Sequence, residues 1–203
     1  MNWLERFHST RVHTRRVRIL AAAAAPLLPA NARVLDVGCG DGRVAAEIGR
    51  HRADVSFVGV EVAPRAGCLI PVTPFDGNHL PFPDGSFDAT VIVDVLHHTE
   101  DPAPLLREAA RVSRDAVLLK DHLREGCCAQ ATLRFMDELG NRRHGVPLPN
   151  RYLSAKEWAR LFADCSLVTV SSDPLRSLYP FPANLIFGRG LHFLVRLKKR
   201  PAA

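Results

Sequence analysis

Three acidic residues follow short apolar runs and could bind different parts of one ligand. Asp36 lies in the run 34–37, directly before three closely spaced glycines. A carboxylate there would repel a pyrophosphate but can pair with a cation. Glu61 lies in the run 58–62, about 20 residues beyond the glycines, where Rossmann-like sites place a carboxylate for ribose hydroxyls. Asp76 follows a third run at 69–72. We expect the three carboxylates to share one ligand-binding edge.

A second group of polar residues could move a proton. Lys120, Asp121 and His122 follow the apolar run 116–119, and His97 follows the run 89–96. Ligands bind at the carboxyl ends of strands in open α/β sheets, so these residues are candidates for acceptor binding. A histidine near its ordinary pKa can act as a general base. His122, Asp121 and His97 are the predicted catalytic residues, with purely structural hydrogen bonding as the alternative.

The glycine spacing excludes two common nucleotide sites. Gly38-Cys39-Gly40-Asp41-Gly42 reads G-x-G-x-G, whereas the dinucleotide fingerprint is G-x-G-x-x-G. No Gly-Lys-Ser/Thr sequence ends the loop, so it is not a phosphate-binding P-loop. An apolar run, a glycine loop and a helical pattern from Val44 onward are still typical of a nucleotide-type site in a doubly wound sheet.

Several elements must position these residues. Helical spacing is present over 105–112, and Ser154 with Glu157 forms a capping-box pattern that predicts a helix through Phe162. The segment 63–67 is too short and too broken for a second crossover helix. The expected strands cover residues 34–37, 58–62, 69–72, 89–96, 116–119, 166–170 and 191–197.

Three motifs carry a resemblance to a known family. They are the glycine segment 34–42, the sequence LPFPDGSFD at 80–88 and the sequence DVLHHTEDP at 94–102. Together they resemble motifs of the class I S-adenosylmethionine (SAM)-dependent methyltransferases, in the small-molecule and quinone methyltransferase-like (methyltransferase type 11) group. The resemblance covers residues 33–120 and weakens from residue 123 onward. It implies an α/β, Rossmann-like, doubly wound sheet of seven strands, mostly parallel with an antiparallel last strand, and helices on both faces.

The resemblance also implies a cofactor site. The cofactor is SAM, and its product is S-adenosylhomocysteine. Glu61 is expected at the ribose, Asp76 at the adenine amino group and Asp36 at the amino acid end. Asp94, His97 and His98 are expected beside the methyl donor. The cofactor-binding residues predicted on this basis are Asp36, Gly38, Cys39, Gly40, Glu61, Val62, Asp76, Gly77 and Asp94.

The expected reaction is O- or C-methylation of a small, apolar acceptor. Two alternatives remain open: methylation of RNA or another nucleic acid, and a non-catalytic SAM-binding protein. No Asn/Asp-Pro-Pro-aromatic sequence follows the fourth run, and no Pro-Cys pair is present. Two kinds of nucleic-acid methyltransferase are therefore disfavoured, those that methylate amino groups and those that use a cysteine nucleophile.

The length predicts one domain over residues 1–203. Residues 1–30 are expected to form a cap helix that ends near Ala25, although the same segment imitates a signal peptide. The segments 123–150 and 173–190 are expected to be acceptor-side insertions, the second as a cover over the acceptor pocket or as an ordinary connection. No apolar run is long enough to span a membrane.

The net charge of +6 raises the possibility of nucleic-acid binding. However, no aromatic residues interleave with the basic groups, so a solvated basic face is favoured and nucleic acid is not expected. The five cysteines contain no C-x-x-C pair, which favours reduced thiols and a cytoplasmic protein. The histidines lack zinc-type spacing, so no metal is expected. The oligomeric state is left open. The basic groups lie at Arg11, Arg15, Arg16, Arg18, Arg196, Lys198, Lys199 and Arg200.

Overall fold

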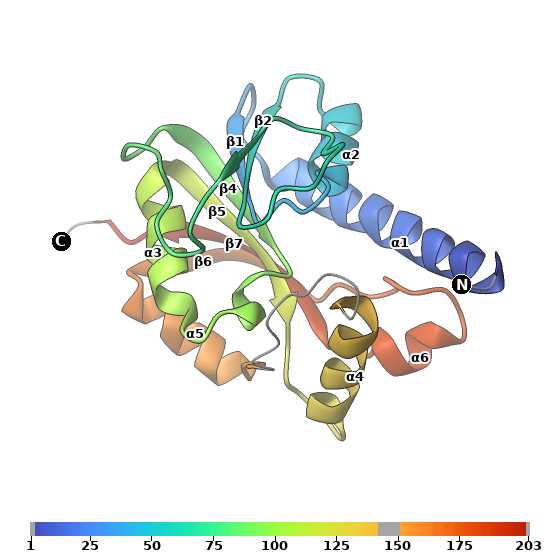
Figure 1. The fold of residues 1–203 in the computed structure, drawn as a ribbon. Coiled ribbons are helices and arrows are strands. Elements are labelled where there is room, and N and C mark those ends of the chain that lie inside the picture. The colour runs from blue at the N-terminus through green and yellow to red at the C-terminus, as the bar shows by residue number, and fades with distance from the viewer. Residues whose placement is uncertain (1–2, 142–150, 202–203) are drawn as a thin grey trace.

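A single seven-stranded sheet organises the chain in the computed structural model, which describes residues 3–141 and 151–201 (Figure 1). The strand order is β3-β2-β1-β4-β5-β7-β6. The strands are β1 (Arg33–Val37), β2 (Ser56–Glu61), β3 (Val72–Pro74), β4 (Phe87–Val93), β5 (Ser113–His122), β6 (Leu167–Asp173) and β7 (His192–Lys199). The α-helices are α1 (Trp3–Ala24), α2 (Arg43–His51), α3 (Pro102–Val112), α4 (Ala129–Asn141), α5 (Ala155–Asp164) and α6 (Ala183–Phe187).

The sheet is parallel except at its last strand. β1 pairs with β2 and β4, and the pairs β2–β3 and β4–β5 are also parallel. β7 lies between β5 and β6 and is antiparallel to both. The carboxyl ends of β1 to β5 therefore meet at one edge, as the doubly wound fold requires. The predicted fold class is confirmed.

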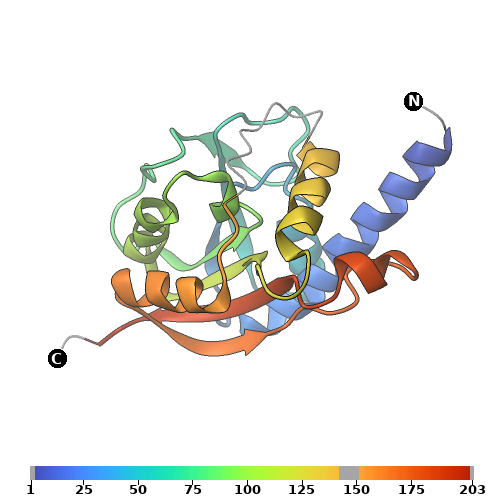
Figure 2. The same ribbon diagram turned by 90° about the horizontal axis from the view of Figure 1, so that it is seen from below.

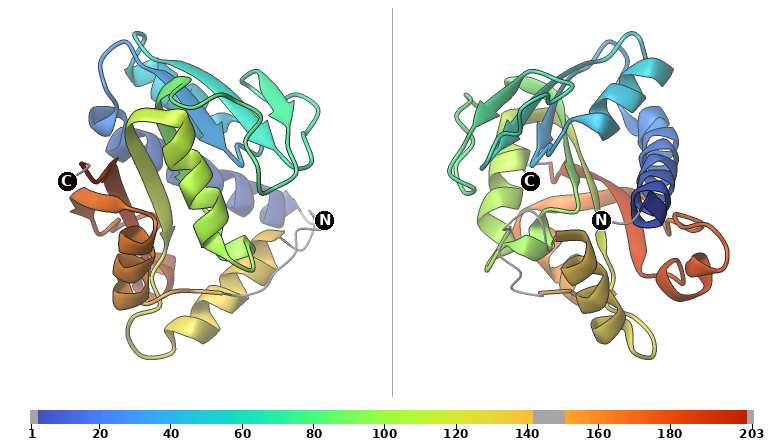
Figure 3. Two further views of the ribbon diagram at one scale, coloured as in Figure 1. Left: turned by 90° about the vertical axis from the view of Figure 1, so that its left-hand side faces the viewer. Right: turned by 45° about the vertical axis from the view of Figure 1, so that its right-hand side comes forward.

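Helices cover both faces of the sheet, because alternate residues of each strand point to opposite faces and both sets are apolar. One core joins Leu35 and Leu119 of the sheet to Leu106 of α3 and Trp158 of α5. The other joins the opposite side of the sheet to α1 and α2. Figures 2 and 3 show α1 and α2 on one side of the sheet and α3 and α5 on the other.

Two strand boundaries differ from the sequence prediction. The third strand begins at Val72 rather than at Leu69, because the Leu69 N–H donates to the Asp41 carbonyl of the glycine loop instead of to the sheet. The fourth strand ends at Val93 rather than at Leu96. Asp94 adopts a left-handed backbone conformation (φ 56°), and the chain turns into a short 3₁₀ helix, Leu96–His98. This turn directs the following histidines towards β5.

The fifth and sixth strands are longer than the apolar runs that predicted them. β5 continues through Lys120, Asp121 and His122, which pair with β7. β6 continues to Asp173, so the irregular segment before β7 begins at residue 174. No helix forms over residues 62–71, as predicted from the broken sequence there.

The sequence predicts helix α1 but not helix α4. α1 ends at Ala24, close to the predicted end, and buries a stripe at the helical spacing of Val17, Leu20, Ala21 and Ala24. α4 forms within the segment 123–150, where no helical period was recognised. The remainder of that predicted insertion, 142–150, lies outside the described residues.

The capping box that opens α5 is confirmed. Ser154 Oγ accepts the Glu157 N–H, and the Glu157 carboxylate accepts the Ser154 N–H. Among the described helices, none combines the length and apolar character needed to cross a membrane.

Candidate cofactor and acceptor site

The glycine loop between β1 and α2 leaves no room for a side chain at its first glycine. Gly38, Gly40 and Gly42 all have positive φ, between 58° and 73°. A Cβ added at Gly38 would lie 2.6 Å from a methyl carbon of Val95. The Gly38 and Cys39 N–H groups donate to the Val60 carbonyl at 2.8 and 3.1 Å, so the loop is fastened to β2.

Asp36 is a buried carboxyl group beside this loop. Its exposed fraction is 4 %, and no donor among the described residues hydrogen-bonds its carboxylate. Burial, together with the negative charges of Glu61 and Asp41, raises the pKa of Asp36 to about 7. A buried carboxylate without a partner is costly, so a cationic ligand would stabilise its charged form.

Glu61 and Asp76 lie at the same edge, at the ends of β2 and β3. The Glu61 carboxylate accepts the N–H groups of Gly40 at 2.8 Å and Val62 at 2.9 Å. Each carboxylate oxygen has a second lone pair for a hydroxyl donor. Asp76 is exposed, and its Oδ1 accepts the Asn78 and His79 N–H groups. The structure thus brings the carboxylates predicted for ribose and adenine to the edge that carries the glycine loop.

The remaining predicted cofactor residues differ in accessibility. Gly77 follows Asp76 with φ 87°, and the Val62 side chain is 59 % exposed. Cys39 packs against Gly59, where an added Cβ would lie 2.5 Å from its sulfur. Burial and the charge of Asp36 raise the pKa of the Cys39 thiol, which suits a space-filling residue rather than a nucleophile.

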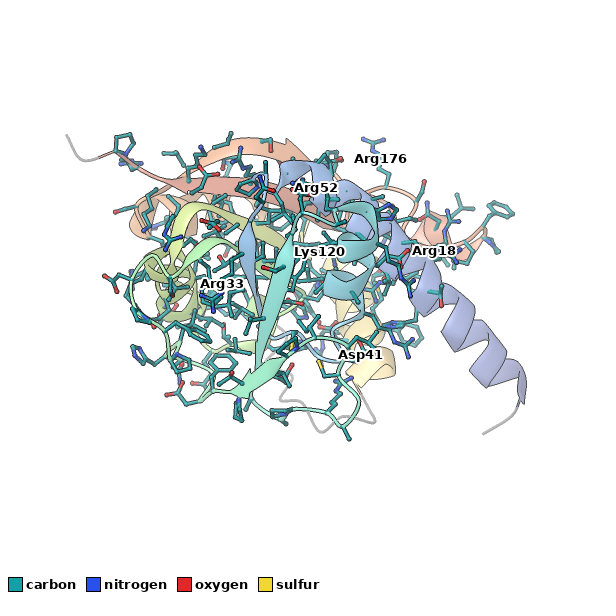
Figure 4. All side chains as sticks on the ribbon, turned by 90° about the horizontal axis from the view of Figure 1, so that it is seen from above. Arg18, Arg33, Asp41, Arg52, Lys120 and Arg176 are labelled. Carbon is teal, nitrogen blue, oxygen red and sulfur yellow. The ribbon has the colours of Figure 1, made fainter. Side chains whose placement is uncertain are left out.

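Asp94 forms a charged group with two cations. The fully buried Lys120 Nζ contacts Asp94 Oδ1, and Arg16 of α1 donates to Asp94 Oδ2 at 2.9 Å. In Figure 4, Lys120 lies within the sheet, whereas Asp41 of the glycine loop lies towards the edge of the sheet. Although burial alone would raise the pKa of Asp94, Lys120, His122 and Arg16 hold it well below its usual range. Because Arg16 belongs to α1, its ion pair with Asp94 also anchors α1 to the sheet.

His97 and Asp121 form a buried pair between the ends of β4 and β5. His97 Nδ1 lies 2.7 Å from Asp121 Oδ1, and the Asp121 carboxylate also accepts the N–H groups of Leu96 and His122. His97 Nε2 lies 3.4 Å from Asp137 of α4, whose carboxylate also accepts the Tyr152 hydroxyl. Burial opposes protonation of His97, but these carboxylates prevail and raise its pKa. His97 is therefore disposed to carry a positive charge.

His122 has the opposite tendency. Burial lowers its pKa, and the cations Lys120 and His97 lower it further. Its Nδ1 lies 3.3 Å from His97 Nδ1, and its ring centroid lies 5.0 Å from that of His192 on β7. The Trp158 indole donates to the His122 carbonyl at 3.0 Å and fixes the backbone there. A neutral imidazole is the form that can accept a proton.

The same cluster contains a set of possible metal ligands. Ligand atoms of Asp94, His97, Asp121 and His122 all lie within 4.8 Å of one another. Asp94 is already paired with two cations, and Asp121 with His97 and two backbone N–H groups. Cations and N–H donors of the protein itself therefore compensate the negative charges of Asp94 and Asp121. The prediction of no metal stays a prediction.

Several residues of the site were missed by sequence reasoning. The sequence predicts Arg16 on a solvated basic face, but in the structure it pairs with Asp94. Asp137, Tyr152 and His192 come from segments without a recognised motif. Only His192 had a usable signal, because it lies in the run 191–197 that predicts the last strand. In the structure it pairs in register with His122. The structure brings together His97, Asp121, His122 and Asp94, and it places the other predicted cofactor residues around β1 to β3.

The segment 174–190, which leads into β7, contacts the polar cluster through His192. The Tyr179 ring lies 5.7 Å from the His192 ring, and the Phe187 carbonyl lies 2.9 Å from His192 Nε2. Arg15 of α1 donates to the Ser177 carbonyl, and the Arg16 guanidinium lies 5.6 Å from the Tyr179 ring centroid. The segment thus contacts both α1 and the polar cluster.

The fold and the glycine loop resemble those of one class of enzyme. A doubly wound sheet with a G-x-G-x-G loop after β1 and acidic residues near the ends of β1, β2 and β3 is the architecture of class I methyltransferases. Residues 35–119 match the family model described as a methyltransferase domain. The segment 35–119 is therefore similar to the methyltransferase domain family, in agreement with the motifs of the sequence.

Relatives of known function are similar over the same part of the chain. The bifunctional methionine biosynthesis protein MetXA/MetW of Rhodopirellula baltica is 38% identical over 106 residues, which cover 45% of this chain and 17% of that protein. The 27-O-demethylrifamycin SV methyltransferase of Amycolatopsis mediterranei is 31% identical over 105 residues, covering 44% of this chain and 38% of that protein. The chain thus spans well under half of these relatives' length.

The fold is also similar to that of solved structures. In the complex between the Haloferax volcanii Trm112 methyltransferase activator and a putative methyltransferase, one chain is 17% identical with a TM-score of 0.68. The match covers 91% of this chain and 90% of that one. At this identity the likeness supports the fold alone.

Proposed function

We propose that the protein transfers a methyl group from SAM to a small, largely apolar acceptor, by O- or C-methylation. The methyltransferase domain supports methyl transfer in general. The name of the Amycolatopsis relative, a demethylrifamycin methyltransferase, supports a small molecule rather than a nucleic acid as the acceptor.

The observation that carries the proposal is the Asp36 carboxyl group, which has no hydrogen-bond donor among the described residues. It is buried next to the glycine loop, and burial and the negative charges of Glu61 and Asp41 raise its pKa. SAM carries an ammonium group at its amino acid end and, when bound, supplies a methyl group already activated by a sulfonium. Asp36 would hold the ammonium, Glu61 the ribose hydroxyls and Asp76 the adenine amino group.

On the acceptor side, His122 is proposed as the base. It is held neutral by burial and by Lys120, so it can accept a proton from a hydroxyl or an acidic carbon. Asp121 would orient His97, whose positive charge would stabilise an acceptor oxygen as it becomes anionic. Positioning of the acceptor against the methyl donor, and exclusion of water by the buried cluster, would supply the remaining rate acceleration.

Calorimetric titration with SAM and S-adenosylhomocysteine tests the cofactor site. We expect micromolar binding to the wild type and a loss of about tenfold or more for Asp36→Ala, which removes a charge-paired group. Asp88→Ala is the matched control. It removes a carboxyl group that accepts the Arg33 backbone N–H and pairs with the Arg114 side chain at the opposite end of β4. Absence of binding to the folded wild type would contradict the proposal.

Replacement of the base separates an enzyme from a non-catalytic SAM-binding protein. His122→Asn is expected to leave SAM affinity within about twofold but to lower methyl transfer by about 10²- to 10⁴-fold, the usual contribution of a general base. A screen of quinone, phenolic and polyketide acceptors with radiolabelled methyl donor supplies the assay. Labelling of RNA in preference to every small acceptor would favour the nucleic-acid alternative.

A further inference from the structure

Four large apolar side chains are exposed around α6. Phe181 is 82 % exposed, Leu185 65 % and Ile186 55 %, and Phe135 of the neighbouring α4 is 56 % exposed. Phe135 stacks on Phe187 with ring centroids 6.3 Å apart, which joins α4 to α6. We call Phe135, Phe181, Leu185 and Ile186 the α6 patch.

Elsewhere in the described part of the chain, large exposed apolar side chains occur singly. Val62 and Leu69 lie near β2 and β3, and Val170 lies on β6. Single exposed apolar residues are normal on a soluble protein, whereas a concentration of them marks an interaction surface. The α6 patch is therefore the candidate interaction surface among the described residues.

Basic residues accompany the α6 patch. Arg176 and Arg189 lie in the segment 174–190, which contains no acidic residue. Arg15 and Arg18 lie on the outer side of α1, and Arg15 is bonded to this segment through Ser177. Figure 4 shows Arg18 and Arg176 on the same side of the molecule. Within the described residues, none of these four arginines forms a salt bridge.

The patch is also connected to the polar cluster. The segment 174–190 exposes the apolar side chains of α6 on its outer side. On its inner side it contacts His192 through the Tyr179 ring and the Phe187 carbonyl. α4 contributes Phe135 to the patch and Asp137 to the cluster. A surface that binds here would therefore lie next to the acceptor side of the site.

We propose that the α6 patch docks on the surface of an anionic lipid bilayer. The four apolar side chains would enter the boundary between headgroups and acyl chains, and Arg15, Arg18, Arg176 and Arg189 would contact lipid phosphates. The excess of unpaired positive charge favours an anionic bilayer over an apolar protein partner or a second copy of this chain, which carries the same charge. Docking requires neither the cofactor nor methyl transfer, so it stands independently of the proposed function.

Vesicle flotation tests the docking. The purified chain is mixed with vesicles of phosphatidylcholine alone or of phosphatidylcholine with phosphatidylglycerol. We expect binding to the anionic vesicles that weakens as salt rises, because the arginine contacts are screened. The double variant Leu185→Asp/Ile186→Asp is expected to lose binding by at least about tenfold, since two apolar anchors become charged.

Two further variants complete the design. Val170→Asp places the same charge at an exposed apolar position on β6 and should bind like the wild type. Arg18→Glu/Arg176→Glu should weaken binding to anionic vesicles by about tenfold or more and leave thermal unfolding unchanged. No flotation of the wild type, or equal flotation of wild type and Leu185→Asp/Ile186→Asp, would overturn the proposal. Self-association that the α6 substitutions abolish, without vesicle binding, would instead identify a second copy as the occupant.

Discussion

At the scale of single residues, the charge on Asp36 makes stability depend on pH. The folded pKa is about 7, above the ordinary value of about 3.9 for an unfolded chain. The unfolded state therefore releases this proton first as pH rises. The stability that protonated Asp36 contributes is present below about pH 4 and is lost as pH rises through about 7.

Asp36→Asn should remove this dependence. At pH 8 we expect the variant to exceed the wild type in free energy of unfolding by about 4 kcal/mol, since the folded and unfolded pKa values differ by about 3, with the difference vanishing near pH 4. Urea unfolding at several pH values measures it. Asp88→Asn is the control with the opposite sign. The Arg33 N–H and the Arg114 side chain lower the pKa of Asp88, so its neutralisation should destabilise the protein at pH 8.

The two tyrosines of the chain form a matched pair for a second prediction. The Tyr179 hydroxyl is buried and has no hydrogen-bond partner among the described residues, whereas the Tyr152 hydroxyl donates to Asp137. Tyr179→Phe should leave the free energy of unfolding unchanged or raise it, by up to about 1 kcal/mol. Tyr152→Phe should lower it by about 1–3 kcal/mol, because a buried carboxylate loses its donor. Equal losses in chemical unfolding of both variants would contradict this reading of Tyr179.

At the scale of elements, the turn from β1 to α2 requires glycine at position 38, because a side chain there would meet Val95. Gly38→Ala combines a left-handed backbone with the close approach of Val95, and we expect a loss of about 2–4 kcal/mol. Gly67→Ala has a similar φ of 79° but open space around the added carbon, so backbone strain alone should cost about 1 kcal/mol. Thermal unfolding compares them, and equal costs would show that Val95 moves aside.

Much of this sheet and its cofactor edge could be predicted from the sequence. Strand, glycine loop and helix follow one another within a few residues, and parallel pairing then brings Asp36, Glu61 and Asp76 to one edge. The acceptor side could not be predicted in the same way. Arg16 reaches Asp94 across 78 residues of sequence, and Lys120 reaches His192 across 72. No local spacing encodes such contacts, because they arise only when α1 and β7 pack against the sheet.

At the scale of the whole molecule, the two cores lie on opposite faces of one sheet and share strand β5. Leu118 of β5 belongs to the core under α1 and α2, and its neighbour Leu119 belongs to the core under α3 and α5. Both side chains are fully buried. We expect Leu118→Ala and Leu119→Ala each to cost about 2–5 kcal/mol and to shift one shared unfolding transition. Circular dichroism and tryptophan fluorescence should report the same midpoint, and separate midpoints would mean that the faces unfold independently.

The burial of Lys120 makes the amine a reporter of opening. The chain contains four lysines, and the other three, Lys156, Lys198 and Lys199, are all at least partly exposed. Acetylation by a small reagent in native buffer should therefore reach those three and spare Lys120, which no reagent can contact while β5 stays paired with β4 and β7. Peptide mass spectrometry after timed labelling would follow modification of Lys120 under native conditions. Its rate would measure how often the centre of the sheet opens.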